Sequence, residues 1–460
     1  MNSPRIPTKL SAPKASPLLA ERRGPEDLAA ADTPSRKFTF YLAVALVFMR
    51  CSLIQETLTY ELHFNLYLLY VVGVLTVLGL IVSGSLLRPF KFRPAYYWFG
   101  YAIWIALAVP FSVWRGESLN LVESYWRTDV VMLFAIGGVV STWRECRTVY
   151  RAIALACVVS LITVRIFGRL DESGRMHLAF STVSNSNDYA AHLLMLLPSL
   201  LWVASVAKSF VMRLAAMATF GYGVYAVLAS SSRGALIALT AGTIYFLFSA
   251  PRKQRVMAVV LVPLLAVIAF SFMPRDAIQR IFSFSASSSS SSEEALESSG
   301  LRSHVLKDSI SYAIHNPIFG VGPGNFSTVE GTANRGFWLE AHNTFTQAAS
   351  ECGLPALIFF VGGIASSFLI FRRTGRKLAE NPEASEFTYA AFCMKLTIVM
   401  FCTAITFLNF AYTFYLPMIG SIAIAMAYVA ETWPAQEISV DPNDHGGIGA
   451  RPRRPAGLSA

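Results

Sequence analysis

Arg233 stands where its side chain can act on a phosphate. It follows three serines in the segment SSSRGALIALTAG, at the start of an apolar helix. The first N–H groups of a helix lack partners within it, so a serine cap, the helix dipole and a cation together form a phosphate-binding corner. The pattern predicts that Arg233 contacts an anionic ligand.

Arg302 belongs to a predicted helix from Leu301 to His315, which ends there because Asn316 precedes a proline. At about 100° per residue, Arg302 falls among apolar residues, and a charge on a packing face needs a partner. Snorkelling or a nearby carboxylate would satisfy it, and a bound anion would serve equally well. The apolar residues of this face are Leu301, Val305, Leu306, Ile310, Tyr312, Ala313 and Ile314.

His342 and Asn343 open a long apolar segment on the same predicted side of the membrane as Arg233. A neutral imidazole, with an ordinary pKa near 6.5, can accept a proton from a hydroxyl group. A single histidine at an interface is also common as a structural residue. We predict catalytic roles for His342, Arg233 and Arg302, and a substrate contact for Asn343.

Several other arginines fall at the outer ends of predicted membrane spans. Charges at membrane depth usually face a cavity, so several cations at one level indicate an anionic ligand. Each also has a local explanation, as Arg127 follows Glu123 by one turn and Arg175 follows Asp171 by four residues. The further substrate contacts that we predict are Arg50, Arg127 and Arg165.

The elements that hold these residues are membrane helices. Hydrophobic residues make up 54% of the chain, charged residues 14%, and the mean hydropathy is +0.49. These values lie outside the range of soluble globular domains. Apolar runs of roughly 17 or more residues, long enough to cross about 30 Å of hydrocarbon, recur along the chain. We predict an all-α protein with about twelve spans, at 38–55, 64–87, 95–113, 122–141, 149–167, 188–206, 211–229, 234–250, 256–273, 342–371, 387–409 and 412–431.

Basic residues gather in every second connection, which predicts that those connections are cytoplasmic. Both termini are then cytoplasmic, and Arg233, Arg302 and His342 lie on the opposite side. These connections hold 25 of the 38 basic residues, so the net charge of +10 needs no nucleic-acid partner. They lie within 1–37, 88–93, 144–151, 208–213, 252–255, 372–377 and 451–454.

The chain divides around one large external loop. Residues 1–37 lack the apolar core of a signal peptide and are predicted to form a disordered tail, as are residues 432–460. Helices 1–9 occupy 38–273, the loop with its amphipathic helix 274–341, and helices 10–12 342–431. The serine run at 283–292 is interpreted as a linker.

Two further patterns limit the chemistry. The turn at Gly320, Gly322 and Gly324 has no dinucleotide-binding spacing and predicts a tight backbone path instead. Six scattered cysteines suggest neither disulfides nor zinc, and no external carboxylate cluster suits a metal, so no metal or cofactor is expected.

A transporter, the rival class, would need carboxylates near the bilayer centre, and the spans hold few.

The segments that carry these residues, taken in order, resemble one protein family. They are SSSRGALIAL, SNSNDYAAHLLMLLP, RSHVLKDSISYAIHNPIFGVGPGNF and AHNTFTQAASECGLPALIFF. The series is similar to the superfamily of O-antigen ligases and O-antigen or exopolysaccharide polymerases, which are bacterial membrane glycosyltransferases. The resemblance covers roughly residues 38–431.

This resemblance implies a GT-C-like fold in the inner membrane, with a large periplasmic loop between helices 9 and 10. It implies a metal-independent, inverting transfer of a glycan from undecaprenyl diphosphate. Ligases use the lipid A core as acceptor, and polymerases use a second lipid-linked glycan. The arginines matching Arg233 and Arg302 would hold the donor diphosphate, and the histidine matching His342 would assist the acceptor hydroxyl.

The sequence departs from the ligase pattern at two positions. The pattern of arginine, three residues and leucine ends here at Ile237, and the pattern that starts at His342-Asn343 ends here at Ala356. A polymerase therefore stays open as the alternative to a ligase.

Overall fold

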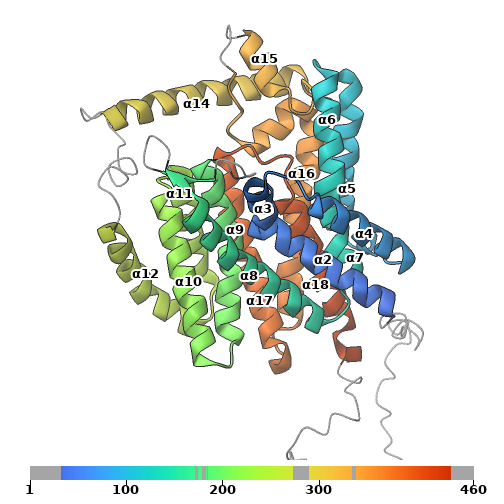
Figure 1. The fold of residues 1–460 in the computed structure, drawn as a ribbon, viewed down its shortest axis with the longest axis vertical. Coiled ribbons are helices and arrows are strands. Elements are labelled where there is room, and N and C mark those ends of the chain that lie inside the picture. The colour runs from blue at the N-terminus through green and yellow to red at the C-terminus, as the bar shows by residue number, and fades with distance from the viewer. Residues whose placement is uncertain are drawn as a thin grey trace, which may run out of the picture.

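The computed structural model describes residues 33–170, 175–178, 183, 185–272, 290–333 and 338–436. These residues are almost entirely helical (Figure 1). The first group of elements is α2 (Pro34–Ser52), α3 (Ile54–Leu62), α4 (Leu68–Val82), η2 (Arg88–Lys91), α5 (Arg93–Ala108), η3 (Val109–Phe111), α6 (Arg115–Tyr125), the π-helical η4 (Trp126–Val130), α7 (Val131–Val139) and α8 (Trp143–Phe167).

A short antiparallel hairpin, in which β1 (Arg169–Leu170) pairs with β2 (Met176–His177), separates the two groups. The second group is α9 (Ser186–Val206), α10 (Phe210–Ala229), α11 (Arg233–Ser249), α12 (Arg252–Phe272), α14 (Ser290–His315), α15 (Phe326–Ala333), α16 (Thr344–Lys377), η5 (Pro382–Ala384), α17 (Ser385–Ala404), η6 (Ile405–Phe407) and α18 (Tyr415–Gln436).

Among the described residues, six helices are long and apolar enough to cross a membrane: α8, α9, α10, α16, α17 with its flanking turns, and α18. Helices α2 and α3 would form a seventh span if counted together, although they meet at a bend of 69°. The prediction of a helical, polytopic membrane protein agrees with this arrangement. Each predicted span overlaps a helix, but the count of twelve spans stays a prediction.

The core lies where α9, α16, α17 and α18 meet. Helix α9 packs against α8, α10 and α17, and α16 packs against α5, α17 and α18 (Figure 1). In α18, every side chain from Tyr415 to Ala427 is buried. A helix that is apolar on all sides is stable where other helices surround it, and this explains its central position.

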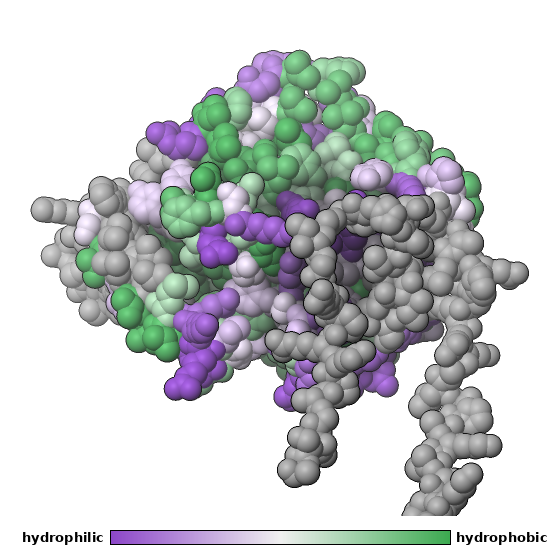
Figure 2. Space-filling model, turned by 90° about the horizontal axis from the view of Figure 1, so that it is seen from below, coloured by the Kyte–Doolittle hydropathy of each residue, from purple (hydrophilic) through white to green (hydrophobic). Residues whose placement is uncertain are grey.

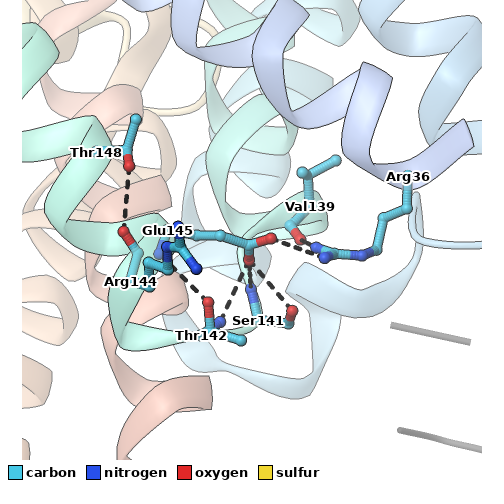
Figure 3. Close-up of polar contacts among 7 residues, drawn as sticks. All are labelled: Arg36, Val139, Ser141, Thr142, Arg144, Glu145 and Thr148. Carbon is cyan, nitrogen blue, oxygen red and sulfur yellow. Dashed lines mark hydrogen bonds and ion pairs between the residues drawn. The ribbon is translucent and has the colours of Figure 1, made fainter. Parts of the chain in front are cut away.

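A polar cluster ties α2 to α7 and α8 (Figure 3). Helix α8 begins with a capping box, in which the hydroxyl of Thr142 accepts from the N–H of Glu145 and the glutamate side chain accepts in return. Arg36 donates to the same glutamate at 2.7 Å and to the carbonyl of Val139 at 2.9 Å. A buried arginine needs such partners, so this cluster sets how α2 lies against α8.

The side of the molecule where α2 begins and α18 ends is opposite to α14 and α15 (Figure 1). Seen from below, it carries separate groups of hydrophilic side chains among hydrophobic ones (Figure 2). Basic residues of the connections that we predict to be cytoplasmic are exposed, among them Arg144, Lys208, Arg252, Lys253 and Arg372. Which side faces the cytoplasm stays a prediction.

Helix α14 crosses the end of the bundle above α11 (Figure 1). Its predicted end at His315 is confirmed. It begins at Ser290, so the linker interpretation is wrong for the last residues of 283–292, and residues 283–289 lie outside the described residues. The predicted apolar face is also too broad, because Val305 and Ala313 are buried whereas Leu301, Leu306, Ile310 and Ile314 are exposed.

The loop after α14 is fastened to a kink in α16. Gly353 has φ 82° and ψ 174°, a conformation that is open essentially to glycine. Pro355 has no N–H group, so the carbonyl of Glu351 has no partner in its own helix and accepts instead from Gly322 at 2.8 Å. The kink thereby binds a segment that follows α14 by a few residues.

The glycine turn in this loop follows the predicted tight path, with φ of 66° at Gly320, 112° at Gly322 and 75° at Gly324. Gly324 N–H donates to the Glu351 carboxylate at 2.9 Å. The C-terminal end of α14 is therefore anchored to α16.

Candidate functional site

A cavity of about 540 Å³ lies between α14, the start of α11 and the loop before α16. Arg233, Arg302 and His342 all line it. A segment from Ala404 to Leu408, at the end of α17, closes another side. Its volume lies within the range of about 300–1,000 Å³ typical of sites for small ligands. Three residues that are far apart in the sequence thus share one cavity.

Arg233 enters the cavity from the first turn of α11. The predicted serine cap is confirmed, because α11 begins at Arg233 and the hydroxyl of Ser232 accepts from the N–H of Ala235 at 3.3 Å. Ser231, with φ 53°, turns the chain into this helix and also lines the cavity. The helix dipole and the guanidinium therefore give this wall a positive charge.

Arg302 reaches the cavity from α14, next to Ser303 and Leu306. Its side chain is exposed, whereas the side of α14 that packs onto the protein carries Val305 and Ser309. The predicted place of Arg302 within the packing face is therefore wrong. It lies at the margin of that face, where the helix meets the cavity.

His342 lies in the loop before α16, with φ 49° and a half-buried side chain. Burial lowers the pKa of its imidazole below the ordinary value, the charge of Arg302 lowers it further, and Glu340 opposes both. The ring is therefore neutral at neutral pH and can accept a proton.

Asn343 has a structural role as well as a place in the cavity wall. Its side-chain oxygen caps α16 and accepts from the N–H groups of Phe345 at 2.9 Å and Thr346 at 3.1 Å. Capping explains why an asparagine follows His342, since the cap sets where the helix begins. Because the side-chain oxygen is engaged in capping, the predicted substrate contact would involve the side-chain NH₂ group.

Arg50 does not line the cavity. Its guanidinium lies 3.5 Å from Asp129 and 3.9 Å from Glu56, and it stacks over the ring of Phe414 at 4.8 Å. These partners account for a cation at this depth, so the predicted substrate contact is not supported.

Arg127 and Arg165 are also outside the residues that line the cavity. Arg127 pairs with Glu123 at 3.3 Å on an exposed helix surface and lies over the ring of Tyr70 at 4.5 Å. Arg165 is exposed in the last turn of α8, where a cation suits the helix dipole. The pair with Glu123 accounts for Arg127, and a helix C-terminus suits the charge of Arg165, so a substrate contact of either stays a prediction.

Two residues that are not among the substrate contacts predicted from the sequence, Arg175 and Asn187, also line the cavity. Arg175 lines it as a third arginine, and its Nη2 donates to Asn187, also in the wall, at 2.7 Å. The sequence pairs Arg175 with Asp171, which lies outside the described residues. Asn185 caps α9, and its side-chain oxygen accepts from the N–H groups of Asn187 and Asp188. In the sequence, the only indication of the contact between Arg175 and Asn187 is that Arg175 lies about ten residues before the polar segment 184–188, which contains Asn187.

Most of the rest of the wall is apolar. One part comes from the first turns of α11, another from α14 and a third from the segment after α17. A cavity that combines cations with apolar side chains fits a ligand that is itself amphiphilic. These apolar residues are Leu236, Ile237, Leu306, Phe407 and Leu408.

Comparison with known protein families identifies the middle of the chain. Residues 218–361 match the family model described as O-antigen ligase. Over this stretch the chain is similar to the O-antigen ligase family. The matched stretch runs from α10 into α16 and contains Arg233, Arg302 and His342. Comparison with curated proteins finds no match.

The O-antigen ligase match covers about a third of the chain. Some of the predicted site residues lie inside it and others lie outside. The three predicted catalytic residues and Asn343 lie within it. Arg50, Arg127 and Arg165, which do not line the cavity, lie before it. Arg175 also precedes it, although this residue does line the cavity.

Among the residues that the structure describes, one group could hold a metal ion. His304 Nδ1 lies 2.5 Å from Asp308, and Glu330 on α15 completes a set whose ligand atoms lie within 4.8 Å of one another. The expectation of no such cluster is wrong. The three residues do not line the cavity.

Proposed function

We propose that this protein is an O-antigen ligase-type glycosyltransferase. It moves a glycan from undecaprenyl diphosphate to an acceptor hydroxyl on the lipid A core, at the periplasmic face of the inner membrane. The observation that carries the proposal is that Arg233, Arg302 and His342 line one cavity beside a capped helix start. The similarity of residues 218–361 to the O-antigen ligase family supports the reaction class.

The donor diphosphate docks between Arg233 and Arg302. A guanidinium presents N–H groups in a planar fork that matches phosphate oxygens, and such charge-assisted hydrogen bonds are strong. The first N–H groups of α11 add donors on the same side. The apolar wall at Leu236, Ile237 and Phe407 receives the first part of the polyprenyl chain.

In the reaction, the anomeric carbon forms a bond to the acceptor oxygen while its bond to the diphosphate oxygen breaks. The leaving diphosphate carries the electron pair of that bond, and the two guanidinium groups stabilise its growing charge without a metal ion. His342 takes the proton of the attacking hydroxyl, a contribution of about 10²-fold to 10⁴-fold for a general base. A single displacement of this kind inverts the anomeric configuration.

The proposed topology places both termini in the cytoplasm and the cavity in the periplasm. It is supported by the alternation of basic connections and by the position of α14 opposite to the start of α2. Fusion of a reporter that is active in one compartment to the C-terminus and, separately, next to α14 tests it. The same compartment for both fusions would contradict the topology.

Transfer in isolated membranes with a chelator present tests the mechanism. Arg233→Ala, Arg302→Ala and His342→Ala should each lower turnover by about 10²-fold or more. Arg127→Ala is the matched control, because it removes an outer-side arginine that does not line the cavity. Wild-type turnover in any of the three cavity variants would refute the role of that residue.

A polymerase of lipid-linked repeats is the second candidate. Ile237 replaces the leucine of the ligase pattern and lies in the cavity wall, so one departure falls in the site itself. Ala356, the other departure, is buried in α16. Mass analysis of surface glycans in a deletion strain distinguishes the two: uncapped lipid A core indicates a ligase, and short unpolymerised repeats indicate a polymerase.

A further inference from the structure

Arg175 joins three segments at the edge of the cavity. It precedes β2, and its half-buried side chain lines the cavity together with Arg233 and Arg302. Its Nε donates to the carbonyl of Ser230 at 2.8 Å, and its Nη2 donates to Oδ1 of Asn187 at 2.7 Å. The guanidinium therefore links the hairpin after α8 to the end of α10 and to the start of α9.

The acceptor Ser230 is the first residue of the turn from Ser230 to Ser232, which places Arg233 in the cavity. Ser230 is the C-terminal cap of α10, Ser231 has a left-handed φ of 53°, and Ser232 is the N-terminal cap of α11. A left-handed conformation is unfavourable for a residue with a Cβ, so neighbouring contacts must hold it. A cation is also favourable beside the last carbonyls of a helix, which lack partners within it. Arg175 supplies both the contact and the charge.

The shape of the guanidinium matters for this contact. Two of its nitrogen atoms donate in different directions, to a backbone carbonyl after α10 and to a side chain of α9. The planar fork holds both acceptors at a set distance from each other. A lysine at this position would keep the charge but could not reproduce that geometry.

We propose that Arg175 is a positioning residue of the donor site. It holds the turn from Ser230 to Ser232 so that Arg233 and the first N–H groups of α11 face the donor diphosphate. This inference rests on the proposed function, since its readout is glycan transfer. Arg175 lies before residues 218–361, the stretch that matches the O-antigen ligase family. The inference therefore adds to the site a residue that the match does not include.

The experiment compares Arg175→Lys and Arg175→Gln with Arg169→Gln. Arg169 lies in the same hairpin, is exposed, donates to Tyr60 at 2.7 Å and does not line the cavity, so it is a matched control. Both Arg175 variants should lower kcat about 10-fold to 100-fold, as expected for a misplaced catalytic group, with a smaller change in KM for a polyprenyl diphosphate-linked glycan. Arg169→Gln should match the wild type.

A double variant tests whether Arg175 acts through Arg233. In an Arg233→Lys background, Arg175→Gln should cause little further loss, because the group that it positions is already altered. Losses that multiply would overturn the inference, as would wild-type turnover of Arg175→Lys. A lowered thermal unfolding midpoint in detergent, with kcat unchanged per folded molecule, would also overturn it, since that result describes a purely structural contact.

The same series separates this inference from the proposed function. If Arg233→Ala keeps full turnover, the proposed function fails. If Arg233→Ala is inactive while Arg175→Gln matches the wild type, the inference about Arg175 fails and the proposed function stands.

Discussion

The charge of Arg302 on α14 acts on the imidazole of His342, 40 positions later in the chain, and lowers its pKa. Both side chains line one cavity. A cation that binds a donor diphosphate thus also keeps the neighbouring base neutral, so that it can accept a proton. In the proposed mechanism, the same cavity therefore holds a donor-binding cation and a base that is neutral before the donor binds.

Arg302→Lys tests whether the fork of the guanidinium matters as well as its charge. A lysine keeps the charge but contacts a diphosphate as a single point, so kcat/KM should fall about 10-fold to 100-fold. Lys307→Ala is the control, because Lys307 is an exposed cation on the same helix and does not line the cavity. Equal rates for Arg302→Lys and the wild type would show that charge alone suffices.

Glu340→Gln should change the pH dependence of transfer in a set direction. The Glu340 carboxylate raises the pKa of His342, so its removal lowers that pKa further. The neutral base then persists to lower pH, and the acid limb of the kcat/KM profile moves to lower pH. The same profile is measured for Glu123→Gln, which alters a carboxylate beside Arg127 instead. A shift to higher pH, or none, would argue against His342 as the base.

Glu330→Gln should remove part of the pH dependence of stability. Burial raises the pKa of Glu330, and Asp308 raises it further, so the folded protein holds this proton more tightly than the unfolded chain. The stabilising contribution is present below the ordinary carboxyl pKa and is lost as pH rises through the folded value. The variant should therefore gain stability relative to the wild type as pH rises.

The thermal midpoint, measured from about pH 5 to about pH 8 with a chelator present, checks this prediction. The chelator keeps any cation from the group formed by His304, Asp308 and Glu330. Glu383→Gln, at an exposed position before α17, is the control. A midpoint difference, variant minus wild type, that falls or stays constant as pH rises would contradict the sign.

Gly353→Ala should disrupt the joint between α16 and the loop after α14. A Cβ there would lie 2.1 Å from the carbonyl oxygen of Ile318, and φ is positive, so we expect a loss of at least about 1–3 kcal/mol. Gly221→Ala, in α10, is the control, because a Cβ there meets no atom within 4 Å. Thermal unfolding in detergent measures both. Equal midpoints would mean that the kink relaxes at little cost.

Local features of the site could be predicted from the sequence because neighbouring residues determine them. The serine cap before Arg233 depends only on residues within about one helical turn of it. The end of α14 at His315 follows from the proline two positions later. The apolar face of α14 was predicted less well. Periodicity shows which residues are apolar, but it does not show how much of the helix another element covers.

Roles that depend on distant partners were not predictable in the same way. Arg50 follows the same rule as Arg233, a cation at the outer end of a span, yet Asp129 and Glu56 hold it outside the cavity. Arg175 reaches Ser230, 55 positions later, by a contact that no local spacing indicates. The sequence distinguishes Arg233 by its serine cap, but only three-dimensional packing shows that Arg175 lies in the cavity and Arg50 does not.

The sequence by itself determined that this is a helical membrane protein, approximately where its apolar helices lie, and which residue types could bind an anion or move a proton. Those properties depend on composition, periodicity and caps, which act over a few residues. The tertiary structure decided which charges share a cavity. The reason is physical: the carbonyl that Pro355 leaves without a partner in α16 accepts from Gly322, and this joint helps to hold α14, with Arg302, over Arg233 and His342.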